Sequence, residues 1–387
     1  MRIRERRRFR RDPLEYLGDL RGRSAAEVVR LPWGGWCVSD ADLAQALLRS
    51  PEFNAGRSGF FADLLPTRAA QVDVGHAVRN FLRKRLPQYR AALAAAVAEL
   101  PVATRWPAVG TGLVYRCLAN LLLHPDAPAA ARRWMTQAVH GGVVFRAPHA
   151  WQRARAELLR ARLVAAVTEQ VRQRRQHGVG EARDVLDAVL GACPDEVTDR
   201  TVAEVHLMMF RSIVAPVGAT LAWSVLLACL HHVDDSPWPW PADQIVREAL
   251  RHRPMVWMLG RTLSRSAELG GTAFDDGDVL SVSPYLLHHD KHHWTDPAVF
   301  RPGRWAEPGE RGPYVPFGAG PFACPGASVA QTLIAEALIA LADHARLTVT
   351  GGDTRAIRIE GNVPRPFTLH RATWQQATTT SEGGEQP

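Results

Sequence analysis

The chain has 387 residues, of which 46% are hydrophobic and 22% charged. A chain of this length and composition can bury a sizeable core, which excludes an intrinsically disordered protein. Its formal net charge is +8, and nearly all the basic residues are arginines, since only Lys84 and Lys291 are lysines. The arginines are scattered along helical stretches rather than gathered in one tail, which argues against a nucleic-acid-binding protein.

The cysteine pattern and the N-terminus point to the cytoplasm. The five cysteines are odd in number, far apart and form no C-x-x-C pair, which argues against a disulfide framework or a zinc site. Residues 1–12 are charged throughout and are not a secretory signal. No stretch of about 20 apolar residues without charge is present, so we expect no membrane span. The cysteines are Cys37, Cys117, Cys193, Cys229 and Cys324.

The first half of the chain predicts one hairpin followed mostly by helices. Residues 28–38 read as a hairpin that turns at Gly34-Gly35, and Asp40 caps a helix that runs through Leu48. Residues 54–74 read as a long loop. The pattern is helical from residue 75 to 100, and further helices follow up to about residue 189.

The second half predicts a long apolar helix and a mixed C-terminal part. The long helix covers residues 202–230, with Pro216 in its middle, and a shorter helix covers residues 242–252. The remaining expected elements are strands within 259–282, an irregular Pro/Gly-rich stretch at 296–321, a helix at 326–344, short strands to about 369, and a disordered tail after 373. The predicted fold class is mainly α with small β-sheets.

The segment FGAGPFACPG, at residues 317–326, carries the strongest chemical signal. Its glycines allow positive φ and a close approach of the backbone to a flat ligand. Pro325 stands where a helix begins, and a helix N-terminus favours a thiolate at Cys324. The alternative is a buried structural cysteine, which is common for an isolated Cys. A thiolate in a glycine-rich loop beside aromatic rings suits an iron porphyrin.

Three motifs in this order resemble the cytochrome P450 family. The loop matches F-G-x-G-x-x-x-C-x-G at every fixed position, an E-x-x-R helix motif stands at Glu248 and Arg251, and F-x-P-x-R-(F/W) places Arg304. The resemblance covers the chain from about Val28 to Leu369. The positions that match the loop motif are Phe317, Gly318, Gly320, Cys324 and Gly326.

The resemblance implies a P450 fold with haem b, iron protoporphyrin IX, held by Cys324. The haem would lie between the long central helix and the Cys loop. Residues 1–373 would form one P450 domain, with its small β-rich part near 28–38 and 259–282, and residues 374–387 a disordered tail. Glu248, Arg251 and Arg304 would form a buried charge network that holds the haem-side loop.

The resemblance also places the haem propionates, with two departures. Arg261 and His76 match the positions at which the family contacts them, and charge-assisted hydrogen bonds explain both choices. Many bacterial members have His or Arg two residues before the cysteine, where this chain has Phe322. The family often has Arg four residues after the helical His, where this chain has Asn80.

The central helix lacks the proton-relay pair of the family. Aligned with A-G-x-(D/E)-T-(T/S), Gly218 takes the acid position, Ala219 the alcohol position, and Thr220 is the nearest hydroxyl. Pro216 removes a backbone hydrogen bond and predicts a kink. Either a water or substrate group replaces the pair in an ordinary hydroxylase, or the enzyme performs aromatic or radical coupling or uses peroxide.

Two surfaces complete the expectations from the sequence. The predicted substrate pocket is apolar and aromatic, which suits a small apolar or aromatic molecule. A basic helix would dock an acidic ferredoxin, although it could equally be an ordinary solvated face. The pocket residues are Phe60, Phe61, Val214, Val217, Val256, Trp257 and Met258, and the basic residues are Arg79, Arg83, Lys84, Arg85 and Arg90.

Four functions therefore stay open. The first is a haem-thiolate monooxygenase that hydroxylates or otherwise oxidises a small natural product in secondary metabolism. The second is a haem-thiolate enzyme of coupling or peroxide chemistry. The third is a haem protein that binds or senses a ligand without turnover. The fourth is a helical protein without haem, against which the intact Cys324 loop argues.

Overall fold

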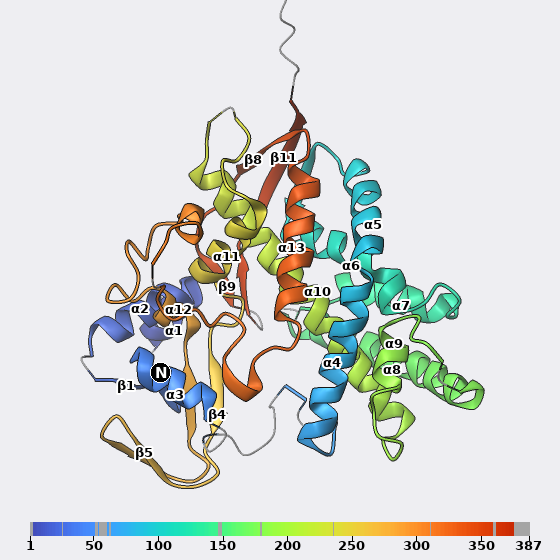
Figure 1. Ribbon diagram of the computed structural model, residues 1–387, viewed down its shortest axis with the longest axis horizontal. Coiled ribbons are helices and arrows are strands. Elements are labelled where there is room, and N and C mark those ends of the chain that lie inside the picture. Colours follow the sequence, from blue (N-terminus) through green and yellow to red (C-terminus); the bar gives the residue numbers. More distant parts are fainter. Residues whose placement is uncertain are drawn as a thin grey trace, which may run out of the picture.

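The computed structural model describes residues 3–24, 26–50, 53, 60–61, 63–145, 149–178, 180–234, 236–309, 311–358 and 361–374. Most of these residues are helical, with four small sheets beside the helices (Figure 1). The helices are α1 Ile3–Arg11, α2 Pro13–Gly22, α3 Ala41–Arg49, α4 Arg68–Lys84, α5 Leu86–Ala98, α6 Ala108–Leu122, α7 Ala129–His140, α8 Ala150–His177, α9 Val185–Leu190, α10 Asp199–His231, α11 Ala242–His252, α12 Pro284–His288 and α13 Ala327–Ala342.

The strands are short, and several of them add side chains to the edge of the main core. They are β1 Val28–Arg30, β2 Trp36–Val38, β3 Ala103–Trp106, β4 Leu259–Thr262, β5 Ala267–Leu269, β6 Thr272–Phe274, β7 Val279–Val282, β8 Ala345–Thr350, β9 Ala356–Arg358, β10 Asn362–Pro364 and β11 Phe367–Thr373. Two 3-10 turns, η2 Pro302–Trp305 and η3 Gly320–Phe322, interrupt the irregular stretch that the sequence predicts.

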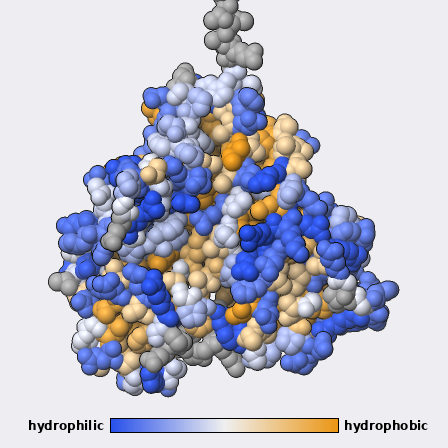
Figure 2. Space-filling view, viewed as in Figure 1, coloured by the Kyte–Doolittle hydropathy of each residue, from blue (hydrophilic) through white to orange (hydrophobic). Residues whose placement is uncertain are grey.

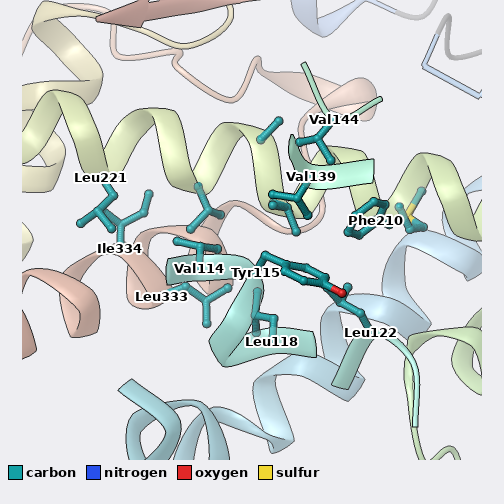
Figure 3. Close-up of a cluster of buried hydrophobic side chains, with 14 of the residues drawn as sticks. Val114, Tyr115, Leu118, Leu122, Val139, Val144, Phe210, Leu221, Leu333 and Ile334 are labelled. Atoms are coloured by element: carbon teal, nitrogen blue, oxygen red, sulfur yellow. The ribbon is translucent and has the colours of Figure 1, made fainter. Parts of the chain in front are cut away.

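Helix α10 is the centre of the molecule. It packs against α6, α8, α11 and α13, and its side chains are buried along most of its length. Figure 3 shows Leu221 and Phe210 of α10 among side chains of α6 and α13. The ring of Phe210 meets Tyr115 edge-on at 5.9 Å, and His206 Nε2 bonds the carbonyl of Leu122 at 2.9 Å. Burial on all sides explains why the sequence of this helix is apolar throughout rather than amphipathic.

Among the described residues, α10 alone has the length and apolarity of a membrane-spanning helix. The most apolar part of α10 has a mean hydropathy of 2.1, and 83% of that window is buried inside the protein. A buried core helix accounts for this composition, as the sequence leads us to expect.

Two boundaries differ from the sequence prediction. Helix α4 begins at Arg68, inside the predicted loop 54–74, because the Thr67 hydroxyl caps it by accepting from the N–H of Ala70. The predicted helix 75–100 is two helices that meet at Arg85. Pro87 lies in the first turn of α5, and since its nitrogen carries no hydrogen it cannot continue the helix from α4. Residues 54–59 of the predicted loop lie outside the described residues. The predicted tail after residue 373 also lies outside them, except for Trp374.

The largest sheet joins the two β-rich segments that the sequence singles out. Its order is β1-β2-β7-β4, with Trp36 opposite Leu280 in a parallel pair and Arg261 opposite Leu280 in an antiparallel pair. The predicted turn residues Gly34 and Gly35 both have positive φ, which closes the hairpin. This sheet places β4 beside the loop that leads into α13 (Figure 1).

Candidate active site

Cys324 lies in a tight loop just before α13. Gly318 and Gly320 have φ of +74° and +69°, and a Cβ on Gly320 would stand 2.5 Å from the Cα of Arg49. Both positions therefore require glycine. The N–H of Cys324 donates to the carbonyl of Phe317 at 2.9 Å, which closes the loop. Cys324 is exposed, whereas the other four cysteines are buried and none forms a disulfide.

The sulfur of Cys324 receives a backbone hydrogen bond from Gly326, as expected just before a helix. One side of the side chain is open, but burial on the other side outweighs that hydrogen bond and raises the pKa of the thiol. The sequence leads us to expect that the helix end alone favours the thiolate, and the structure differs because burial opposes it. A coordinating metal ion deprotonates such a thiol regardless.

Helix α4 approaches the Cys loop at Gly75, a residue that belongs to none of the three sequence motifs. A Cβ at this position would lie 2.9 Å from Cγ of Pro325, so only glycine lets the helix and the loop pack this closely. Its neighbour His76, the predicted propionate contact, is exposed on α4. Glycine in the middle of a helix is the signal that could have indicated this contact.

A buried charge network holds the segment that precedes the Cys loop. Glu248, wholly buried on α11, accepts from Arg251 Nη2 at 2.8 Å and from Arg304 Nε at 3.1 Å. The backbone N–H of Arg301 and the indole N–H of Trp305 complete its hydrogen bonds, at 2.9 and 3.1 Å. The structure thus brings together the three residues that the family resemblance joins, and all their charges are paired or bonded to carbonyls.

His288 extends this network to the Cys loop, although no motif marks it. Its Nδ1 bonds the carbonyl of Arg251 at 3.1 Å, and its Nε2 accepts from the N–H of Val315 at 2.9 Å. Val315 stands two residues before Phe317, where the loop begins. Complete burial lowers the pKa of His288 to about 3, and the neighbouring Arg251 adds to the effect. The ring therefore stays neutral and can accept this hydrogen bond.

Two arginines from distant parts of the chain meet at the ring of Phe322. The guanidinium carbon of Arg68 lies 4.5 Å from the ring centroid, and that of Arg261, on β4, lies 5.4 Å away. Arg68 also donates to the carbonyl of Pro321. Arg261 is 8% exposed, and within the described chain its buried Nε has no hydrogen-bond partner. Burial lowers the pKa of both guanidinium groups.

On α10, the two relay positions face different neighbours. Ala219 is buried and packs with Met255, Val363 and Phe145, an apolar cluster that includes a residue just after α11. Gly218 faces α6 instead, since a Cβ on it would lie 2.7 Å from the Cα of Thr111. Helix α10 continues through Pro216 to His231. Thr220 is buried, and its carbonyl accepts from the Ser224 hydroxyl at 2.8 Å.

The predicted pocket residues are spread over different environments. Val214 and Val217 are buried in the main core, Phe61 is buried and Phe60 is about half exposed. Trp257 packs on Phe9 and Trp33 in an aromatic cluster beside α1. Val256 is exposed and Met258 half-buried, whereas Met255, which the sequence analysis omits, lies against Ala219. In extended backbone, successive side chains point to opposite sides, so Met255 lies on the side opposite to the exposed Val256. This alternation could have indicated Met255 from the sequence.

The basic residues of α4 and α5 fall into two groups. Arg83 and Lys84 are exposed at the end of α4, and the surface over α4 is hydrophilic in Figure 2. Arg79 bonds Asn80, and Arg85 lies over the ring of Phe81. Arg90, on α5, forms an ion pair with Glu336. Of these five cations, Arg90 is the one whose charge is paired with a carboxylate of the described residues, and Arg83 and Lys84 are exposed at the end of α4.

The fold matches solved cytochrome P450 structures. A zebrafish cytochrome P450 with progesterone superposes with a TM-score of 0.76 at 20% identity, covering 93% of this chain and 99% of that chain. Similarity at this level of identity establishes the fold. The sequence profile described as Cytochrome P450 matches residues 242–366, which contain Glu248, Arg251, Arg304 and the Cys324 loop.

The C-terminal part of this chain, residues 242–366, matches the cytochrome P450 family in sequence, and the fold of the chain is that of the cytochromes P450. Two P450 relatives come from Streptomyces melanosporofaciens. Cyclooctatin synthase is 32% identical over 43% of this chain and 43% of its own length. Cyclooctat-9-en-7-ol 5-monooxygenase is 36% identical over 28% of this chain and 25% of its own. The chain thus aligns with less than half the length of either relative.

Cytochromes P450 use haem, and the residues around Cys324 fit this group. The exposed sulfur stands in a loop whose backbone is compact because of Gly318 and Gly320. Beside it, the buried Nε of Arg261 is left without a partner in the described chain, as expected for a group that binds a carboxylate. A thiolate ligand and cationic groups for the propionates are what a haem of this family requires.

Proposed function

We propose that this cytochrome P450 binds haem b through Cys324 and is a monooxygenase that oxidises a small, largely apolar or aromatic natural product. The observation that carries the proposal is the exposed Cys324 sulfur in its glycine-constrained loop, near buried Arg261 and half-buried Arg68. Neither arginine pairs with a carboxylate of the residues that the structure describes. The names of the two Streptomyces relatives, a cyclooctatin synthase and a 5-monooxygenase, support oxidation in bacterial secondary metabolism.

The chain's own residues would divide the work as follows. Cys324 would supply the thiolate ligand. The N–H of Gly326 would donate a hydrogen bond to the Cys324 sulfur and reduce the electron density on that sulfur. Ala219, Met255 and Phe145 would exclude water and contact the apolar substrate. Glu248 and His288 would hold the loop in place from behind. When bound, haem supplies the redox chemistry that activates oxygen.

A second candidate is coupling or peroxide-driven chemistry, and one structural observation favours it. The contact of Gly218 with the Thr111 backbone leaves no room for an acidic side chain at that position of α10. With Ala219 carrying no hydroxyl, the chain provides no acid-alcohol pair to deliver protons there. Thr220 would be the nearest hydroxyl, and Pro216 would loosen the backbone one turn earlier.

Three further expectations belong to this proposal. Residues 1–373 would form a single P450 domain followed by a tail. The protein would work in the cytoplasm, which suits five unpaired cysteines. It would receive electrons from an acidic ferredoxin-type partner at a basic surface that includes Arg79, Arg83, Lys84 and Arg85.

The test begins with the spectrum of the haem-loaded protein. We expect the reduced, carbon monoxide-bound form to show the red-shifted Soret band of thiolate-ligated haem, because Cys324 is the exposed thiol. The variant Cys324→Ser should keep the fold by circular dichroism and lose that band. A folded wild type that takes up no haem, or a band that survives Cys324→Ser, would contradict the proposal.

The same preparation separates the three haem-based functions. Candidate substrates are incubated with the protein and a ferredoxin system, and separately with the protein and peroxide. If the protein is a monooxygenase, the incubation with the ferredoxin system should give oxygenated product. Product from peroxide alone, or ring-coupled product into which no oxygen atom is inserted, with peroxide or dioxygen as the oxidant, supports the second candidate. Ligand-induced spectral shifts without any product would indicate a binding or sensing protein.

A further inference from the structure

Half-buried Arg68 and buried Arg261 lack the carboxylate partner that Arg174 and Arg251 have. Arg174 lies 2.6 Å from Asp184, and Arg251 lies 2.8 Å from Glu248, so each buried cation there has its own carboxylate. Neither Arg68 nor Arg261 forms such a pair with any residue that the structure describes, and burial is the sole cause of the lowered pKa in both.

Arg68 and Arg261 are also close to one another. Both lie over the Phe322 ring, so their guanidinium carbons are within about 10 Å of each other. Two like charges at this distance, partly removed from water, repel each other and favour an anion between or beside them. Each keeps donors that are not used: Arg68 bonds the Pro321 carbonyl, and Arg261 the Gly260 carbonyl at 3.0 Å.

We propose that Arg68 holds one of the two haem propionates and that, together with Arg261, it forms a clamp centred on Phe322. The inference rests on the proposed haem binding at Cys324. Haem b carries two carboxylates at one edge, and the pair of cations matches them in number and sign. Arg68 belongs to α4 and Arg261 to β4, so the propionates would tie these two elements together across the Cys loop.

The clamp also explains the Phe322 departure. A His or Arg at this position would add a third cation beside two that are already present. Phenylalanine instead places an aromatic ring 4.5 and 5.4 Å from the two guanidinium carbons, and such a ring attracts cations without adding charge. Phe322 would therefore position the anchors rather than serve as one, and the exposed His76 would not be needed.

The experiment measures haem loss from the loaded protein to an excess of an apo-haem scavenger. We expect Arg68→Gln and Arg261→Gln to lose haem about 10- to 100-fold faster, the effect of removing a charge-assisted hydrogen bond. Arg68→Lys should be intermediate, since it keeps the charge but loses the planar stacking fork. The control Arg162→Gln removes an exposed guanidinium 5.1 Å from the Trp134 ring and should lose haem at the wild-type rate.

Loading with haem dimethyl ester separates propionate binding from a structural role. With both carboxylates methylated, the difference between wild type and Arg68→Gln should disappear. A difference that persists with the ester, or an Arg68→Gln that retains natural haem like wild type, would overturn the proposal. Because these comparisons use wild type that shows the thiolate spectrum, their failure is distinct from a wild type that binds no haem.

Discussion

Glu248 illustrates how single residues hold this site. It is wholly buried, yet its two oxygens accept from two guanidinium groups, a backbone N–H and an indole. The remaining donors of Arg251 and Arg304 reach backbone carbonyls of the segment 288–299. Removal of one member of such a group leaves buried charge uncompensated, which typically costs about 3–5 kcal/mol. The network therefore fixes the irregular segment that has no regular hydrogen bonding of its own.

His288 allows a prediction about pH. Its pKa is about 3 in the folded protein and near 6.5 in an unfolded chain, so below pH 6.5 the unfolded state binds one more proton. The stability that His288 contributes is present above pH 6.5 and is lost as pH falls toward 3. The slope should be about 1.4 kcal/mol per pH unit from this residue.

The variant His288→Gln keeps a donor and an acceptor but does not titrate. Urea unfolding between pH 4 and 7 should show a free energy of unfolding whose pH slope is smaller than that of wild type by this amount. His206, His252 and His289, whose pKa values are also lowered by burial, contribute to the slope in both proteins. Equal slopes in the two proteins would mean that His288 is not buried and neutral.

At the scale of elements, α10 and α6 approach each other closely at Gly218. Gly218 allows it, because its missing Cβ would fall 2.7 Å from Cα and 2.8 Å from Oγ1 of Thr111. This contact is between backbones and cannot be relieved by a change of rotamer. An acidic residue at position 218 would therefore disturb the packing of α10 on α6, and its effect on proton delivery could not be separated from that change. Ala219→Thr is the better probe of the missing relay.

The prediction for these helices concerns Gly218→Ala. We expect it to destabilise the protein by about 1–3 kcal/mol, because it forces α10 and α6 apart. The matched control is Gly112→Ala, one residue along α6 from Thr111, whose Cβ would meet only His140 Cε1 at 3.6 Å. That control should be neutral or stabilising by up to about 1 kcal/mol. Chemical denaturation measures both, and equal effects would show that Gly218 has no special packing role.

At the scale of the whole molecule, charge is distributed unevenly between paired and free groups. Of the five basic residues predicted to dock a ferredoxin, Arg90 pairs with Glu336, Arg79 and Arg85 contact the neutral side chains of Asn80 and Phe81, and Arg83 and Lys84 are exposed. Exposed cations steer an acidic partner over a range set by the Debye length, which is about 8 Å at physiological salt.

Reversal of these two charges should slow electron delivery. For Arg83→Glu/Lys84→Glu we expect a reduction rate by an acidic ferredoxin about tenfold lower at low salt, with the difference shrinking as salt rises. The control Arg10→Glu/Arg11→Glu makes the same change of net charge at exposed residues of α1. Stopped-flow reduction measures both variants. Equal loss in the control would indicate a general charge effect rather than docking at α4.

The sequence by itself determined the elements whose signals are local. The hairpin at Gly34-Gly35, the cap at Asp40, the bounds of α11 and the apolar character of α10 all follow from turn residues, caps and periodicity. The Cys324 loop was predicted from the offsets of its glycines and proline, and the charge network from the resemblance to the cytochromes P450.

Tertiary structure decided which of the remaining residues meet. Arg68 and Arg261 are far apart in the chain, and only the packing of α4 and β4 around the Cys loop brings both to Phe322. The same holds for Gly75 against Pro325, His288 against Val315 and Met255 against Ala219. The sequence carries at most a local hint of these contacts, such as the glycine inside α4, and does not identify the partner, because the contacts arise from close packing between elements that are not neighbours in sequence.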